Sequence, residues 1–110
     1  MKKLFISQPM KGKTNEEIKA EREKAIASVK GALGEDVEVI DNFFDIIRSY
    51  DVRPLWFLGK SLQLLSTADI AYFAEGWEDA RGCKIEHQCA DEYGIPIIIE
   101  YHAGEKESEE

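Results

Sequence analysis

Glu86 is the residue of this sequence whose position best suits chemistry on a bound small molecule. It follows Gly82 by one turn in the last expected helix, at the edge of an apolar stripe formed by Ile85, Cys89 and Tyr93. A carboxylate placed there would be partly desolvated, and such a group can act as a nucleophile or as a general base. Position alone favours a plainer alternative, an exposed glutamate that interacts with the helix dipole.

The loop between residues 8 and 14 has features of a segment that binds phosphate or ribose. It holds two lysines and Gly12, and it leads into an expected helix whose start is marked by Thr14 and Glu17 in capping-box spacing. Backbone amides at a helix start and a glycine that permits close approach can cradle such a group. A solvated loop before a capped helix explains the pattern equally well. The loop is not a Walker motif, so hydrolysis of nucleoside triphosphates is not indicated.

Three other side chains suit a nucleotide ligand, and each has a structural alternative. Arg81 could hold a phosphate, or it could form a surface salt bridge with Glu86 or Asp79. Trp77, in the loop after an expected strand, could stack on a base, cap the core or meet a partner subunit. Phe43 offers a similar platform after an earlier strand, although core packing is favoured there.

The cysteines do not indicate a metal site. Cys83 and Cys89 lie six residues apart with His87 between them, and no further cysteine completes a zinc-binding pattern. We therefore expect structural thiols, and neither a metal nor an organic cofactor.

The elements that must position these residues alternate between strand and helix. Short apolar runs bounded by turn signals predict strands at 4–6, 37–40, 69–74 and 97–99. Helical spacing and capping signals predict helices at about 14–33, 54–65 and 81–93. This alternation predicts a parallel sheet with helices on both faces and right-handed crossovers. We expect a doubly wound, three-layer αβα fold of the flavodoxin or Rossmann type, with four or five strands in an order near 2-1-3-4.

In such folds the ligand crevice lies beyond the carboxyl ends of the strands, where the strand order reverses. The loops expected there are 7–14, 41–53 and 75–82. The candidate residues fall within these loops or directly after them, so we expect a single site.

Composition indicates one globular domain without a broad surface for nucleic acid or membrane. The 110 residues are 44% hydrophobic and carry a net charge of −8, which suits one core and offers no cluster of lysine and arginine for a polyanion. We expect the domain to span 1–103, followed by an acidic, disordered tail at 104–110. The first apolar run is too short for a signal peptide, and none approaches a bilayer span, so we expect a cytoplasmic protein.

The order of several motifs resembles the nucleoside 2-deoxyribosyltransferase family, over residues 4–99. The segment Gly82-Cys83-Lys84-Ile85-Glu86, followed by Ala90 and Gly94-Ile95-Pro96, is similar to the family signature. Phe5-Ile6-Ser7-Gln8-Pro9-Met10 resembles its first strand and loop, and Asp69 matches the aspartate that opens its third strand. Gly76-Trp77-Glu78 with Arg81-Gly82 and Glu86 resembles an uncharacterised branch associated with phages and prophages.

The resemblance implies an N-glycosidic enzyme with Glu86 as its nucleophile. In that family the matching glutamate attacks the anomeric carbon of a deoxynucleoside, and water or a second base resolves the glycosyl-enzyme, as in retaining glycosidases. Phe5 replaces a tyrosine that helps to orient the nucleophile, and Ser61 replaces an assisting aspartate. Asp79 and Asp69 remain as candidate assisting acids. Because loss of general acid help costs about 10²–10⁴-fold in rate, slow hydrolysis or pure binding stays open beside base exchange.

The expected substrate is a nucleoside or a nucleoside 5′-monophosphate. The candidate binding residues are Ser7, Gln8, Pro9, Met10, Gly12, Phe43, Gly76, Trp77, Arg81 and Gly82. Two alternatives are a non-catalytic module that senses or sequesters a nucleotide, and a protein-interaction domain that acts through the Trp77 loop. Apolar residues on the 54–65 helix, around Trp56, together with the resembled family, imply a homodimer or a larger homo-oligomer.

Overall fold

A computed structural model describes residues 1–42 and 54–100. The order of elements is β1 (Lys2–Ser7), α1 (Asn15–Leu33), β2 (Val37–Val39), α2 (Pro54–Leu65), β3 (Ile70–Phe73), the 3₁₀ turn η2 (Trp77–Asp79), α3 (Arg81–Glu92) and β4 (Ile97–Ile99). The four strands pair in parallel in the order β2-β1-β3-β4. The predicted αβα fold and strand order are confirmed. The predictions for Phe43 and for the 104–110 tail lie outside the described residues.

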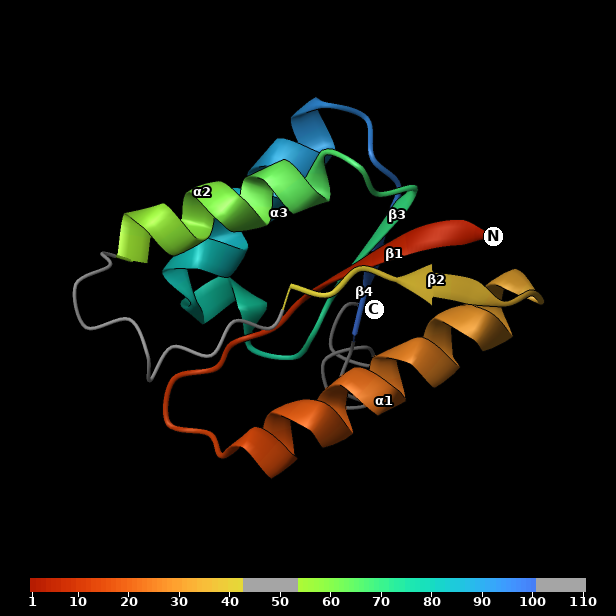
Figure 1. Ribbon diagram of the computed structural model, residues 1–110, viewed down its shortest axis with the longest axis horizontal. Coiled ribbons are helices and arrows are strands. Elements are labelled where there is room, and N and C mark those ends of the chain that lie inside the picture. The colour runs from red at the N-terminus through yellow and green to blue at the C-terminus, as the bar shows by residue number, and fades with distance from the viewer. Residues whose placement is uncertain (43–53, 101–110) are drawn as a thin grey trace, which may run out of the picture.

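The sheet is buried on both faces because helices cover each of them: α1 lies on one side, and α2 and α3 lie on the other (Figure 1). Side chains of β1 alternate between the two cores. Leu4 and Ile6 pack with Val29 of α1. Phe5 packs with Leu65 of α2 and with Ala90 of α3. Each fully buried side chain of this kind contributes about 1.5–3 kcal/mol, so β1 anchors both layers.

Helix α1 begins and ends where the sequence indicates. Thr14 caps its start, accepting a hydrogen bond from the Glu17 amide, while the Glu17 carboxylate accepts one from the Thr14 amide. At the other end, Gly34 has a φ of 72°, a left-handed conformation that favours glycine. The capped start fixes where the loop after β1 must enter the helix.

The strand order reverses between β1 and β3, which are neighbours in the sheet although α1, β2 and α2 separate them in sequence. This is the position at which doubly wound folds bind ligands. Ser7, the last residue of β1, is in register with Phe73, the last residue of β3. The candidate site therefore lies beyond these two residues.

No helix within the described ranges is long and apolar enough to cross a membrane.

Candidate active site

The buried face of α3 is centred on Glu86. Cys83, Glu86 and Ala90 are the buried residues of this helix, and Glu86 is only 8% exposed. The sequence-based prediction of a stripe through Ile85, Cys89 and Tyr93 is wrong, since Tyr93 is 82% exposed. The alternative of an exposed glutamate at position 86 is therefore also wrong.

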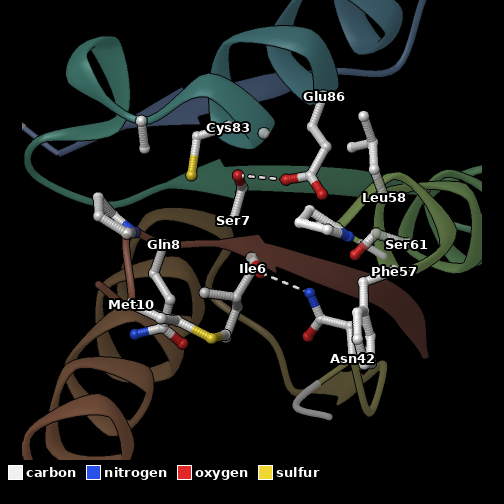
Figure 2. A pocket seen from close by; sticks show the side chains of 14 residues that line it. Ile6, Ser7, Gln8, Met10, Asn42, Phe57, Leu58, Ser61, Cys83 and Glu86 are labelled. Atoms are coloured by element: carbon white, nitrogen blue, oxygen red, sulfur yellow. Dashed lines mark hydrogen bonds between the residues drawn. The ribbon is translucent and has the colours of Figure 1, made fainter. Parts of the chain in front are cut away.

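Ser7 holds the Glu86 carboxylate at the end of β1. Its Oγ donates a hydrogen bond to Oε1 of Glu86 at 2.6 Å, and both side chains are buried (Figure 2). A hydrogen bond to a charged acceptor is stronger than one between neutral groups and shorter as well. Ser7 therefore fixes the position of one oxygen of the Glu86 carboxylate.

Burial raises the pKa of Glu86, and hydrogen bonds from the hydroxyls of Ser7 and Ser61 act in the opposite direction. Ser61 is itself buried on the face of α2 that meets α3. No lysine or arginine lines the cavity around Glu86 within the described part of the chain, so no cation compensates the desolvated charge. Such a carboxylate binds a proton, and attacks an electrophilic carbon, more readily than an exposed glutamate does.

The raised pKa predicts how stability depends on pH. Because the folded protein holds the Glu86 proton above the ordinary carboxyl pKa of 4.5, the free energy of unfolding falls as pH rises through the raised value. Glu86→Gln, which cannot ionise, should therefore melt at a higher temperature than the wild type at neutral pH. The expected gain is about 4–8 °C for each kcal/mol. It should disappear below pH 4.5, where both forms are neutral.

Thermal denaturation at several pH values checks this prediction, with Glu92→Gln as the matched control because Glu92 is an exposed glutamate of the same helix. A lower melting temperature for Glu86→Gln across the whole pH range would contradict it.

Glu86 opens into a cavity of about 250 Å³. The walls combine apolar side chains from the β1 loop and from α2 with a few polar groups at the strand ends (Figure 2). The lining residues are Ile6, Ser7, Gln8, Pro9, Met10, Asn42, Pro54, Phe57, Leu58, Ser61, Ala80, Gly82, Cys83 and Glu86. The volume is slightly below the ~300 Å³ at which small-molecule sites begin, so it suits a compact, mostly neutral group.

A second cavity adjoins the first, and the two share Pro9, Met10, Ala80 and Gly82. It measures about 590 Å³ and is lined as well by Lys11, Gly76, Asp79 and Arg81. It includes the first turn of α3, whose N-cap residue, Ala80, provides no side-chain cap. Cations and a helix start suit an anionic group, so the charged end of a ligand fits here and the neutral end fits beside Glu86.

Gln8 lines the first cavity, but its side chain is engaged with α1. Its Nε2 donates to the carbonyl oxygen of Ile18 at 3.2 Å and to Oε1 of Glu21 at 3.0 Å. Its Oε1 accepts a hydrogen bond from Arg22 at 3.2 Å. Gln8 therefore fixes the loop after β1 and does not present a free amide to a ligand.

Trp77 lies against the core and lines neither cavity. Its ring stacks on His87 with centroids 4.2 Å apart, and it packs against Phe73 at 5.7 Å. Of the predicted roles for Trp77, the structure therefore places it as a cap on the core. Gly12 also lines neither cavity.

The two candidate assisting acids lie away from Glu86. Asp69 directly precedes β3, at the amino end of that strand, whereas Glu86 lies beyond the carboxyl ends of β1 and β3. The Asp69 carboxylate accepts a hydrogen bond from the Lys3 amide, and the Asp69 amide donates one to the Lys3 carbonyl oxygen, both at 2.8 Å. That position places the Asp69 carboxylate away from any ligand held beside Glu86. Asp79 is exposed and lines only the second cavity.

Cys83 contributes a thiol to the first cavity, and burial raises its pKa to about 11. A thiol that stays protonated at neutral pH is a poor nucleophile, so Glu86 is the stronger candidate. No group of three or more histidine, cysteine or acidic side chains could hold a metal ion within residues 1–42 and 54–100.

Sequence reasoning missed Asn42, Phe57 and Leu58, which line the cavity. Phe57 and Leu58 were hidden within an apolar helix that resembles a core element. The signal for Asn42 was its place directly after β2, at the carboxyl end of the strand that pairs with β1, because ligands of such folds bind beyond the carboxyl ends of the strands.

Comparisons with protein-family models, with curated proteins and with solved structures found no match to this chain.

Proposed function

We propose that this protein is a nucleoside or nucleotide N-glycosidic enzyme, of the 2-deoxyribosyltransferase or deoxynucleoside 5′-monophosphate glycosidase type. The observation that carries the proposal is Glu86 itself: a carboxylate at the centre of a buried helix face, held by Ser7 and facing a cavity whose described lining residues include no lysine or arginine. Burying an uncompensated carboxylate is costly. A role as nucleophile accounts for its retention there.

The proposed reaction has two balanced steps. In the first, an oxygen of the Glu86 carboxylate attacks the anomeric carbon and the bond from that carbon to the base nitrogen breaks. The electron pair stays on the base, which takes a proton from water. In the second step, water attacks the anomeric carbon, the ester bond to Glu86 breaks, and the water proton passes to solvent. A second base in place of water would give transfer.

The adjoining cavities suggest how such a substrate would lie. The sugar would sit at Glu86 and Ser7, and a 5′-phosphate would reach the second cavity, near Lys11 and Arg81. The base would occupy the apolar end near Phe57 and Leu58. An enzyme of this kind would act on the cytoplasmic nucleotide pool.

The experiment that tests the proposal is incubation of the purified protein with each common deoxynucleoside and its 5′-monophosphate, with free base followed by chromatography. Release of base from at least one of them is expected. If none releases base while one raises the melting temperature, the protein is a nucleotide-binding module and the enzymatic proposal fails.

We also propose that the protein self-associates through α2. This helix is rich in large apolar side chains, yet only Ser61 and Leu65 are buried. Leu55 is 74% exposed, and its neighbour Trp56 is 52% exposed. Adjacent exposed apolar side chains of this size are typical of an interaction surface.

Trp56→Glu should therefore convert a dimer or larger oligomer into a monomer, because a charge would be placed in the apolar contact. Sedimentation velocity measures the change, with Ala27→Glu, at an exposed position of α1, as a control for added negative charge away from the proposed contact. A wild-type protein that is monomeric at every concentration tested would contradict the proposed association.

A further inference from the structure

Asn42, one of the residues that line the Glu86 cavity, has a buried and unsatisfied hydrogen-bond acceptor. The residue is 5% exposed, and its Nδ2 donates to the carbonyl oxygen of Ile6 at 2.8 Å (Figure 2). Its Oδ1 is shielded from solvent and has no hydrogen-bond partner within the described residues. A buried acceptor left unpaired costs free energy of the same order as a lost hydrogen bond, so a feature of this kind calls for an explanation.

The orientation of the Asn42 amide is fixed by its neighbour. The carbonyl oxygen of Ile6 can only accept a hydrogen bond, so the atom facing it at 2.8 Å must be the amide nitrogen. Exchanging the two ends would place two acceptors against each other. The end left over is therefore an acceptor, and only a donor can satisfy it.

The surroundings of Asn42 indicate which part of a substrate would bring that donor. Pro54, Phe57 and Leu58 line the same cavity and are apolar, whereas Lys11 and Arg81 line only the adjoining one. A phosphate would therefore lie away from Asn42. A flat, neutral heterocycle suits the apolar walls, and the nucleobases carry N–H donors on their edges.

We propose that Asn42 is a specificity-determining residue that accepts a hydrogen bond from an N–H group of the substrate base. The inference rests on the proposed N-glycosidic function and names the feature of the base that the site recognises. A base with a donor at this position satisfies Oδ1, whereas an analogue without it leaves the acceptor buried and unpaired, which is the arrangement that gives strong discrimination in binding sites.

Binding of free bases, which are products of the proposed reaction, tests the inference without requiring turnover. Matched pairs that differ in one donor serve as probes: adenine and purine, cytosine and the pyrimidinone without its amino group, and thymine and its N3-methyl form. Calorimetric titration of the wild type should show at least one pair in which the donor base binds about 5-fold or more tightly. Asn42→Leu should remove that preference. Asn42→Ser, which shortens the side chain and lacks Oδ1, serves if the leucine variant does not fold.

The outcomes separate this inference from the function on which it rests. Equal binding within every pair, or a preference that persists in the Asn42 variants, would overturn the role of Asn42 and leave the base site standing. If no base and no nucleoside binds at all, the proposed function fails and the inference fails with it.

Discussion

Replacing Glu86 with glutamine should reduce base release by at least about 10³-fold, the scale of loss seen when an enzyme loses its nucleophile. Glutamine has nearly the same shape, and its side-chain oxygen can still accept the hydrogen bond that Ser7 donates to Oε1 at 2.6 Å. The fold and the cavity should therefore persist while the attacking oxygen loses its charge. The same variant should be more stable at neutral pH, since burial raises the pKa of Glu86 and its ionisation destabilises the folded state.

The combination of higher stability and lost activity distinguishes a functional carboxylate from a structural one. Substrate binding, measured by titration with the substrate found in the panel, should change little in Glu86→Gln. Glu92→Gln changes an exposed glutamate on the same helix and should leave base release as in the wild type. Activity retained in Glu86→Gln would remove Glu86 from the chemistry.

Ser7→Ala should lower base release by about 10–100-fold, because a hydrogen bond to a charged group is worth about 1.5–3 kcal/mol and each 1.4 kcal/mol is about tenfold in rate. Ser7 is 1% exposed and makes the 2.6 Å contact with Glu86. Its hydroxyl lowers the pKa of that carboxylate, so its loss should raise the pKa further. The rise of activity with pH, as Glu86 ionises, should therefore move to higher pH in the variant.

The shifted pH profile is the reading that a merely structural role would not produce. Ser66→Ala serves as the control, since Ser66 is an exposed residue just after α2 whose hydroxyl donates to the carbonyl oxygen of Gln63 in the last turn of that helix. An unchanged pH profile in Ser7→Ala, with activity lowered only in proportion to folded protein, would show that Ser7 does not position the nucleophile.

The fold could be predicted from sequence because its signals are local. Short apolar runs, the Thr14 capping box and the glycine after α1 each depend on neighbours in the chain, and alternating elements then leave few topologies. The switch point followed from the topology, and it identified the loops that line the two cavities.

The details of the site depend on tertiary packing that the sequence does not display. The face of α3 was misassigned because Cys89 and Tyr93 outweigh small residues in a hydrophobic pattern. The helix in fact buries Cys83 and Ala90, whose small side chains permit close approach to the sheet. Asp69 was predicted to be an assisting acid from its sequence position. Its hydrogen bonds with Lys3 instead hold it at the amino end of β3, away from Glu86. The contact of Asn42 with Ile6 spans 36 residues, and no local pattern indicates it.

The most direct test of the central claim is mass spectrometry of the protein after rapid acid quenching of a reaction with its best deoxynucleoside or deoxynucleoside 5′-monophosphate. We predict an adduct equal in mass to the transferred sugar or sugar phosphate, located on the peptide that contains Glu86 and absent from Glu86→Gln. Base release with the sugar attached to another residue, or with no adduct at any quenching time while Glu86→Gln remains active, would contradict a glutamate nucleophile at this position.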